Sequence, residues 1–503
     1  MNYKSSGVAL PIFSLPDKYG IGTIGKGAKK FIDFLAKAGF SYWSILPLVP
    51  TAFLDSPYQS FSSKALNPFF IDLEDLIDKG LLKKKDLNNI DWGDNPRKVD
   101  YGKIFVNRKK ILRIAFKRFI KGQGDYQKGY TSFIRKNGYL DYACFMTLKD
   151  QYSYKAWPDY DPPYDDYSEK HFREIKHLNK DDVEFNIWTQ YIFLRQWDQL
   201  TNYAHEKGIK IIGEMPMYVS YDSVEVYKHY RNFQLDNKRR MTETAGYPPD
   251  FFYKTGQVWG NPLYNFDYMK KNYYRFFRDR LNYYLKLYDI IMISSSRCIL
   301  EYYSLPYGSK DGLNGTWKKG PGAGFGTVCN NYHNRLIAED VDFESQEFSE
   351  FLDSTKLPDT KVSELAFPRG LDNPNNPLNY HYSCYSFSTT HDCDTLVSYL
   401  SSMSEADHQK AIDEIIKTCK RFGITPPQND NRQAAQAIME MNLASNSKVA
   451  IQSMNDILLQ GSEARINTPS TKGNNWTYRI TEEDFNKDLA FELRALNIKY
   501  GRN

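Results

Sequence analysis

The sequence predicts an α/β fold, because short apolar runs alternate along the chain with helical or loop-rich stretches. Buried parallel strands give nearly continuous apolar runs, and crossover segments connect them. Eight such runs are present. This number favours a closed (β/α)8 barrel of the TIM type, although an open doubly wound sheet gives a similar pattern. No internal repeat, coiled coil or low-complexity linker divides the 503 residues, so we expect one barrel across 1–503.

The expected elements follow in chain order. A strand at 7–13 precedes an amphipathic helix at 27–38, and a second strand lies at 42–48. Six further strands are expected at 209–219, 289–294, 335–340, 360–366, 386–390 and 449–454. The long interval before the third strand holds a helical stretch at 103–121 and a loop rich in Tyr, Asp and Pro at 156–166. We interpret about 73–205 as an inserted helical subdomain and about 221–287 as a second, smaller one.

Composition excludes several classes of function. The 66 basic and 61 acidic residues nearly cancel, so the chain lacks the excess of positive charge that is typical of nucleic-acid-binding proteins. Short basic runs are interpreted as solvated faces. Aromatic residues make up 16% of the chain. That share fits either flat ligand-binding surfaces or the codon bias of an AT-rich genome, and the sequence leaves both explanations open.

Cysteine usage and hydropathy indicate the compartment. The six cysteines form no C-x-x-C pair and are scattered, as expected for reduced thiols. The apolar run near the N-terminus is too short for a signal peptide, and no run is long enough to span a membrane. We therefore expect a cytoplasmic protein that is neither secreted nor membrane-bound.

Acidic residues follow several of the predicted strands. In barrels, catalytic groups lie at the carboxyl ends of strands. These ends carry Glu214, Glu339 with Asp340, and Asp392, whereas the strand at 289–294 ends on Ser294. Converging carboxyl groups suit glycoside chemistry, because one acid can protonate a leaving oxygen while carboxylates stabilise an oxocarbenium-like centre. The alternative for any single acid is an ion pair or a helix cap.

Two loops combine polar and aromatic side chains. They lie at 55–62 and at 248–262, the second including Phe251 and Phe252. Sugars stack on Tyr and Trp faces while amides and carboxylates bind the hydroxyls, although such residues also form ordinary turns. A metal site at 391–394 is disfavoured, because neighbouring residues of a strand point to opposite faces.

Together these residues resemble the amylomaltases, the 4-α-glucanotransferases of glycoside hydrolase family 77. The likeness runs almost from end to end and includes Gly-Ser-Glu-Ala-Arg-Ile-Asn-Thr-Pro at 461–469. The other matching segments are 14–16, 19–22, 55–62, 67–68, 216–219, 222–223, 245–250, 256–264, 317–322, 337–340, 372–374 and 390–395.

The resemblance implies a barrel with inserted subdomains and no separate C-terminal β-domain, and retaining transglycosylation of α-1,4-glucans or maltooligosaccharides without a metal or organic cofactor. It implies that Glu339 is the general acid/base and that Asp392 stabilises the transition state. His391 beside it is expected to contact sugar hydroxyls. The residues expected to line glucose subsites are Ser56, Tyr58, Asp250, Gln257, Trp259 and Asn467.

The resemblance fails at the fourth strand, where the family's nucleophile lies in Arg-Ile-Asp-His-Phe-Arg-Gly. Here 292–298 is Met-Ile-Ser-Ser-Ser-Arg-Cys, so Ser294 occupies the nucleophile position and Met292 replaces the leading Arg. The usual Asp of the third strand is Glu214. Serine without an adjacent base is a weak nucleophile and carries no charge, so we expect weakened or lost activity. A shift of register that brings Asp289 or Glu301 into this role is the alternative.

Three functions remain in competition. The first is a slow 4-α-glucanotransferase that uses Glu339. The second is a non-catalytic glucan-binding protein that scaffolds or regulates a glucan-metabolising enzyme as its partner. The third is a hydrolase that uses another carboxylate, which product analysis would separate from transfer.

Overall fold

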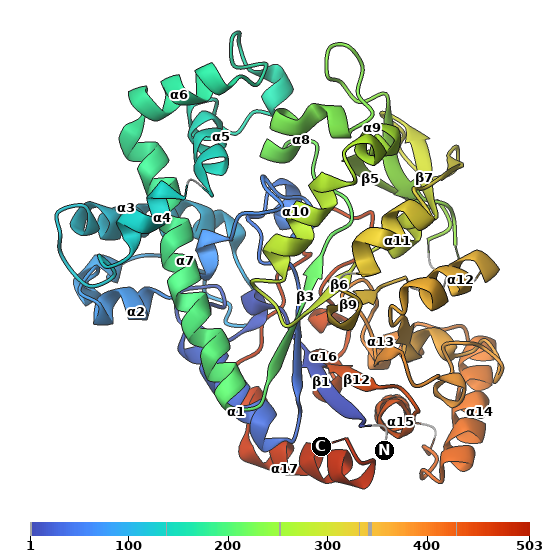
Figure 1. Ribbon diagram of the computed structural model, residues 1–503. Helices are drawn as coiled ribbons and strands as arrows, with labels where there is room; N and C mark the ends of the chain where they lie inside the picture. The colour runs from blue at the N-terminus through green and yellow to red at the C-terminus, as the bar shows by residue number, and fades with distance from the viewer. Residues whose placement is uncertain are drawn as a thin grey trace.

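The computed structural model describes residues 3–136, 138–250, 253–330, 332–340, 345–428 and 430–502. Its centre is an eight-stranded parallel sheet in which neighbouring strands follow the chain order (Figure 1). The strands are β1 (Ser5–Ala9), β2 (Tyr42–Ile45), β3 (Lys210–Met215), β6 (Ile290–Ile293), β9 (Leu336–Ala338), β10 (Thr360–Val362), β11 (Tyr385–Phe387) and β12 (Val449–Ser453). A parallel bridge between Ala338 and Asp359 joins β9 to the start of β10 and so connects the two ends of the sheet. The predicted (β/α)8 barrel is confirmed, and the open-sheet alternative is wrong.

All eight predicted strands are present, and each is shorter than the apolar run that predicted it. Proline explains three of these early ends, because it donates no ladder hydrogen bond. Pro11 lies beyond the end of β1, Pro47 beyond β2, and Pro216 directly after β3. The residues beyond these ends therefore belong to the loops at the carboxyl ends of the strands.

The interval between β2 and β3 is helical, and these helices lie beside the barrel in Figure 1. They are α2 (Leu73–Asp78), α3 (Tyr101–Phe119), α4 (Tyr130–Arg135), α5 (Leu140–Gln151), α6 (Glu169–Leu178) and α7 (Lys180–Glu206). The helix expected at 103–121 corresponds to α3. The subdomain bounds of about 73–205 and 221–287 stay a prediction.

A small antiparallel sheet was not predicted. It has the order β5-β4-β7-β8 and is built from β4 (Glu243–Tyr247), β5 (Gln257–Pro262), β7 (Glu301–Pro306) and β8 (Thr316–Lys319). Two of its strands precede β6 and two follow it, so no contiguous sequence pattern indicates the sheet. The helices of the same part of the chain are α8 (Val224–His229), α9 (Phe266–Lys271), α10 (Arg275–Tyr284) and α11 (Ala323–Asn330).

The remaining helices include α16 (Met454–Ile457), which directly follows the carboxyl end of β12 and is buried. They are α1 (Lys26–Lys37, predicted at 27–38), α12 (Gln346–Thr355), α13 (Leu396–Ser401), α14 (Glu405–Phe422), α15 (Asn431–Ala444), α16 (Met454–Ile457) and α17 (Lys487–Lys499). The strand β1 and the segment after α17 lie together, because the buried Arg502 guanidinium donates to the carbonyl of Ser5 at 2.9 Å. Within the described ranges, no helix combines the length and apolar character needed to cross a bilayer.

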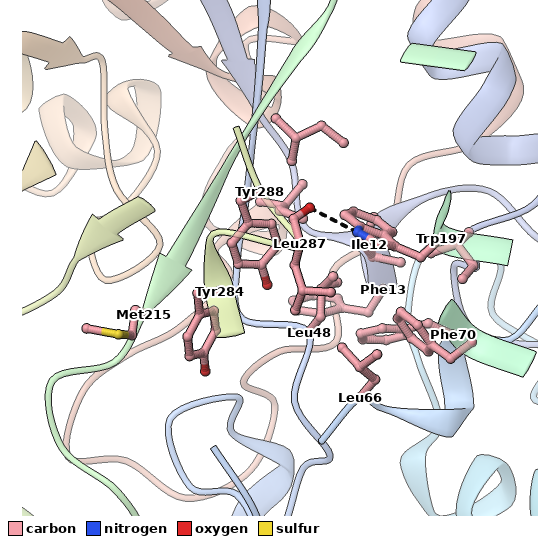
Figure 2. Close-up of a cluster of buried hydrophobic side chains, with 14 of the residues drawn as sticks. Ile12, Phe13, Leu48, Leu66, Phe70, Trp197, Met215, Tyr284, Leu287 and Tyr288 are labelled. Carbon is pink, nitrogen blue, oxygen red and sulfur yellow. Dashed lines mark hydrogen bonds between the residues drawn. The ribbon is translucent and has the colours of Figure 1, made fainter. Parts of the chain in front are cut away.

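Many of the aromatic side chains belong to the core. Figure 2 shows one such cluster, in which the Trp197 indole of α7 donates to the Leu287 carbonyl at 3.0 Å beside Tyr284 and Tyr288. Tyr284 is almost fully buried and donates its hydroxyl to the carbonyl of Ser63 at 2.8 Å. A buried tyrosine needs such a partner. Packing therefore uses a large part of the aromatic residues, and ligand surfaces explain only some of them.

Candidate active site

The loops at the carboxyl ends of the strands enclose a cleft of about 1180 Å³. All ten predicted site residues line it: Ser56, Tyr58, Asp250, Gln257, Trp259, Ser294, Glu339, His391, Asp392 and Asn467. A second cavity of about 40 Å³ lies in the barrel and is lined by Glu214, Met292 and Glu339 together with mostly apolar residues. The structure thus brings together residues that are up to several hundred positions apart in the sequence.

Glu339 is held at the end of β9. Its backbone N–H donates to the carbonyl of Ile293 at 3.0 Å, which fixes it beside the end of β6. Burial raises the pKa of the Glu339 carboxyl well above its usual range, and the charges of Glu214 and Asp392 raise it further. A carboxyl group that retains its proton near neutral pH can act as a general acid.

Asp392 is positioned by a separate set of contacts. Its Oδ1 accepts a hydrogen bond from Asn467 Nδ2 at 2.6 Å and lies 3.4 Å from His391 Nε2. Its backbone carbonyl accepts from Arg465 Nη2 at 3.1 Å. The carboxyl group is half-exposed and lines the cleft.

The segment 391–394 lies in a turn beyond β11, which ends at Phe387, and not in a strand. The alternation argument against a metal site there does not apply. The side chains nevertheless have different partners, because Cys393 Sγ lies 3.3 Å from Thr390 Oγ1 and Asp394 pairs with Arg465 at 3.5 Å.

Ser294 directly follows β6, and its N–H donates to the carbonyl of Met215 at 3.2 Å. Neither Asp289 nor Glu301, the two alternative acids, occupies the position of Ser294. Asp289 lies at the opposite end of β6, where Ile211 N donates to it at 2.8 Å and His205 Nε2 lies at 3.0 Å. Glu301 lines the cleft, but its Oε1 accepts from Arg297 Nε at 3.0 Å.

Glu214 is a carboxyl group that sequence reasoning noted at a strand end without assigning it to the site. It lies on β3, is fully buried, and accepts a hydrogen bond from Tyr58 Oη through Oε1 at 2.7 Å. Burial raises the pKa of Glu214 above its usual range, whereas His391, Tyr58 and Ser294 act to lower it. The signal that could have found it is an acid at the end of a buried apolar run.

Aromatic rings form one wall beside these acids. The rings of Tyr58 and His391 stack at 5.0 Å with an angle of 16° between their planes. Trp476 lies 5.9 Å from the His391 ring and was not predicted. Burial raises the pKa of Tyr58 well above its usual range, so its hydroxyl stays a hydrogen-bond donor. Ser56 Oγ accepts from the Tyr58 N–H at 3.2 Å and shapes this loop.

The small antiparallel sheet supplies a second wall. Trp259 on β5 donates its indole N–H to Gln257 Oε1 at 2.9 Å, and its ring lies 6.3 Å from that of Tyr247 on β4 with 23° between the planes. Asp250 Oδ1 accepts from the N–H of Tyr253 at 2.6 Å. Phe251 and Phe252, which the sequence analysis placed in this loop, lie outside the described residues.

One group of side chains in the described part of the chain has the composition of a metal site. Asp359, His381 and Cys384 lie together before β10 and β11, at the amino ends of the strands and therefore opposite the cleft. His381 Nε2 is 3.0 Å and Lys361 Nζ 3.4 Å from the Asp359 carboxylate, so a ring nitrogen and an ammonium group already contact it. Burial raises the pKa of the Cys384 thiol, which disfavours the thiolate that binds metals.

An acidic cleft with aromatic walls at the carboxyl ends of a (β/α)8 barrel is typical of proteins that act on glycosidic bonds. The family model described as 4-alpha-glucanotransferase matches residues 10–484. The chain therefore belongs to the 4-alpha-glucanotransferase family, which confirms the resemblance.

Curated relatives and a solved structure agree with this assignment. The chain is 37% identical over 498 residues to the 4-alpha-glucanotransferase of Clostridium butyricum, covering 98% of this chain and 99% of the relative. It is 34% identical over 500 residues to that of Thermus thermophilus, covering 98% of both. The amylomaltase from Streptococcus agalactiae in complex with acarbose is 30% identical and superimposes with a TM-score of 0.91, covering 99% of this chain and 100% of the other.

Proposed function

We propose that this protein binds α-1,4-glucans in the cleft and transfers 4-α-glucanosyl units between them at a rate far below that of relatives with a carboxylate at position 294. The observation that carries the proposal is the combination of Glu339 and Asp392 in one cleft with Ser294 beside them. The first two groups serve acid catalysis and charge stabilisation, whereas the hydroxyl at 294 brings no charge.

Binding is proposed to use the two aromatic walls. A helical glucan presents apolar sugar faces that stack on rings such as Trp259, and its hydroxyls match amides such as Gln257 and Asn467. The cleft of about 1180 Å³ exceeds the roughly 300–1,000 Å³ of an ordinary small-molecule site, which suits a chain of several sugars.

In the proposed reaction, Glu339 donates its proton to the glycosidic oxygen as the bond to the anomeric carbon breaks. Asp392 stabilises the positive charge that develops on the ring, and Asn467 holds its carboxylate in place. Glu339 then removes the proton from the incoming 4-hydroxyl of an acceptor glucan. Loss of one member of such a set typically lowers the rate by several orders of magnitude.

The test is the incubation of purified protein with maltotriose, followed by chromatography of the products. We expect glucose and longer maltooligosaccharides to form slowly, and Glu339→Gln prepared in the same way to form neither, which excludes a contaminating enzyme. The Clostridium butyricum relative provides the reference rate. Turnover equal to that reference, or none in the wild type, contradicts the proposed slow transfer.

The second candidate is a non-catalytic glucan-binding protein that recruits or regulates a glucan-metabolising enzyme. The observation that favours it is the run of three serines, Ser294, Ser295 and Ser296, beside retained subsite residues. It requires maltoheptaose to bind in calorimetry without any products from maltotriose. Shorter sugars alone would instead indicate the hydrolase. For either candidate we infer the cytoplasm as the compartment.

A further inference from the structure

We propose that Glu214 is the nucleophile of the slow transglycosylation, and that its carboxylate replaces the one that position 294 lacks. The inference rests on the proposed function, because it requires a glucan in the cleft. It assigns a covalent role to a side chain that the sequence analysis gave none.

The strand register brings Glu214 toward Ser294. Glu214 pairs with Met292 on the neighbouring strand, two residues before Ser294, so Ser294 lies about 6.6 Å further toward the cleft at about 3.3 Å per residue. The glutamate side chain extends into this interval, because the Ser294 side chain lies close enough to its carboxyl group to lower its pKa, and both residues line the same cleft. An aspartate at 214 is one methylene shorter and reaches less far toward the position of the missing carboxylate.

The two carboxyl oxygens of Glu214 differ in their hydrogen bonding. Tyr58 Oη donates to Oε1 at 2.7 Å, whereas Oε2 has no hydrogen-bond partner among the described residues. An unpartnered buried oxygen lowers the stability of the fold and calls for an explanation, one of which is catalysis. Glu214 lines both the small barrel cavity and the large cleft, so it lies at the junction of the two.

The groups around Glu214 favour a proton on Glu339 rather than on Glu214. The charged and titratable groups that interact with it are His391, Asp392, Tyr58, Glu339, Tyr284 and Tyr288. Burial raises the pKa of both carboxyl groups, and the charge of Asp392 raises both further. For Glu339 the charges of Glu214 and Asp340 add to this rise, whereas for Glu214 the contacts with His391, Tyr58 and Ser294 oppose it. Of the two acids, Glu214 therefore ionises first. A nucleophile must be ionised while the acid is protonated.

In the proposed step, a Glu214 oxygen forms a bond to the anomeric carbon, the glycosidic bond breaks, and the leaving oxygen takes the proton of Glu339. The product is a glucosyl ester on Glu214 and a shortened glucan. An acceptor 4-hydroxyl then attacks the same carbon and gives its proton to Glu339, and the Glu214 carboxylate leaves.

The competing chemistry is attack by the Ser294 hydroxyl with Glu214 as its base. It would form an ether-like glucosyl bond to serine. An alkoxide is a far poorer leaving group than a carboxylate, so this adduct would turn over no faster than the substrate itself. The two chemistries differ in the atom that carries the sugar, and this difference can be measured.

The experiment uses the full chain and 4″-deoxy-α-maltotriosyl fluoride, a donor with a good leaving group that cannot serve as an acceptor. After acid quenching and peptic digestion, mass spectrometry locates the sugar. We expect it on Glu214 in the wild type. In the variant Ser294→Asp, which acts as a positive control, we expect it on the introduced carboxylate. A sugar on Ser294, a sugar on any other residue, or no adduct in the wild type overturns the proposal.

Two variants test the assignment by turnover. Glu214→Gln is expected to lower maltotriose disproportionation at least 100-fold, while Ser294→Ala lowers it no more than about tenfold, because it removes only an uncharged hydroxyl beside Glu214. Glu414→Gln is the matched control, since Glu414 on α14 is buried, accepts from Gly370 N at 3.1 Å, and does not line the cleft. The reverse order of the first two variants also overturns the proposal.

Maltoheptaose binding distinguishes this inference from the function on which it rests. If Glu214→Gln binds maltoheptaose like the wild type and still turns over, the nucleophile assignment is wrong and the glucan site stands. If the wild type binds no glucan, the proposed function fails first.

Discussion

Restoring the carboxylate at position 294 is expected to need a cation at position 292. The perturbation is a comparison of Ser294→Asp, Met292→Arg and the double variant. An aspartate at 294 stands beside Glu214 and Glu339, and the described contacts of Glu214 and Glu339 include no lysine or arginine. The single substitution therefore adds a third carboxyl group to a buried acidic cluster without compensation.

The size of the effect follows from the geometry. Carboxyl groups of a retaining site are about 5–5.5 Å apart. Two unit charges at about 5 Å repel by about 3 kcal/mol at an effective dielectric constant of about 20, which corresponds to roughly two pKa units. Met292 is the register partner of Glu214, so a guanidinium at 292 lies within reach of the cluster. Its attraction offsets a similar amount, which predicts a gain of about 100-fold for the double variant over Ser294→Asp.

The assay is the initial rate of maltotriose disproportionation from about pH 5 to 9. We expect Ser294→Asp alone to be a poor catalyst near neutral pH and the double variant to be the most active of the series. Met292→Arg alone is expected to move the acidic limb of the profile to lower pH, because the cation favours the ionised form of Glu214. If Ser294→Asp alone equals the double variant, the reasoning about the uncompensated charge is refuted.

Three further predictions concern single side chains. Trp259→Ala is expected to weaken maltoheptaose affinity about tenfold in calorimetry through the loss of a stacking face, whereas an unchanged affinity would place the sugar elsewhere. Asn467→Ala is expected to lower transfer more than binding, because it frees the Asp392 carboxylate; equal losses in both would contradict a positioning role. Burial raises the pKa of Glu364 from 4.5 to about 8, so its carboxyl is protonated in the folded chain and ionised in the unfolded chain between these values, and stability falls as pH rises through that window. The free energy of unfolding of Glu364→Gln, measured in urea, is therefore expected to rise relative to that of the wild type by up to about 1.4 kcal/mol per pH unit. Parallel curves of unfolding free energy against pH would refute the shift.

The barrel could be predicted from the sequence because its signal is local. Each strand is a short apolar run, and prolines such as Pro216 mark where three of the strands have ended. The convergence of Glu339 and Asp392 also followed, since the carboxyl ends of parallel strands face the same end of a barrel. These inferences need only the order of the runs and one rule of topology.

The parts that could not be predicted depend on contacts between distant segments. The antiparallel sheet that carries Trp259 pairs β4 with β7 across the whole of β6. Trp476 lies in a loop and has a backbone φ of 62°. The sequence gives no sign of this left-handed conformation, which is uncommon in residues other than glycine. The hydrogen bond from Tyr58 to Glu214 joins residues 156 positions apart, and only the folded chain brings them together.

The residues at the end of β6 are expected to weaken the chemistry without weakening the barrel. Met292 belongs to the apolar cluster inside the barrel, with Ile212, Ile337 and Val362 among its members. An apolar side chain packed there is neutral or more stable than a buried ion pair of similar volume by about 1–4 kcal/mol. The acid Glu339 retains its proton through burial and through Glu214 and Asp392, none of which depends on residue 294. We therefore expect the double variant, Met292→Arg with Ser294→Asp, to gain activity and to have a lower free energy of unfolding. Such a loss of stability commonly accompanies charged groups in an active site.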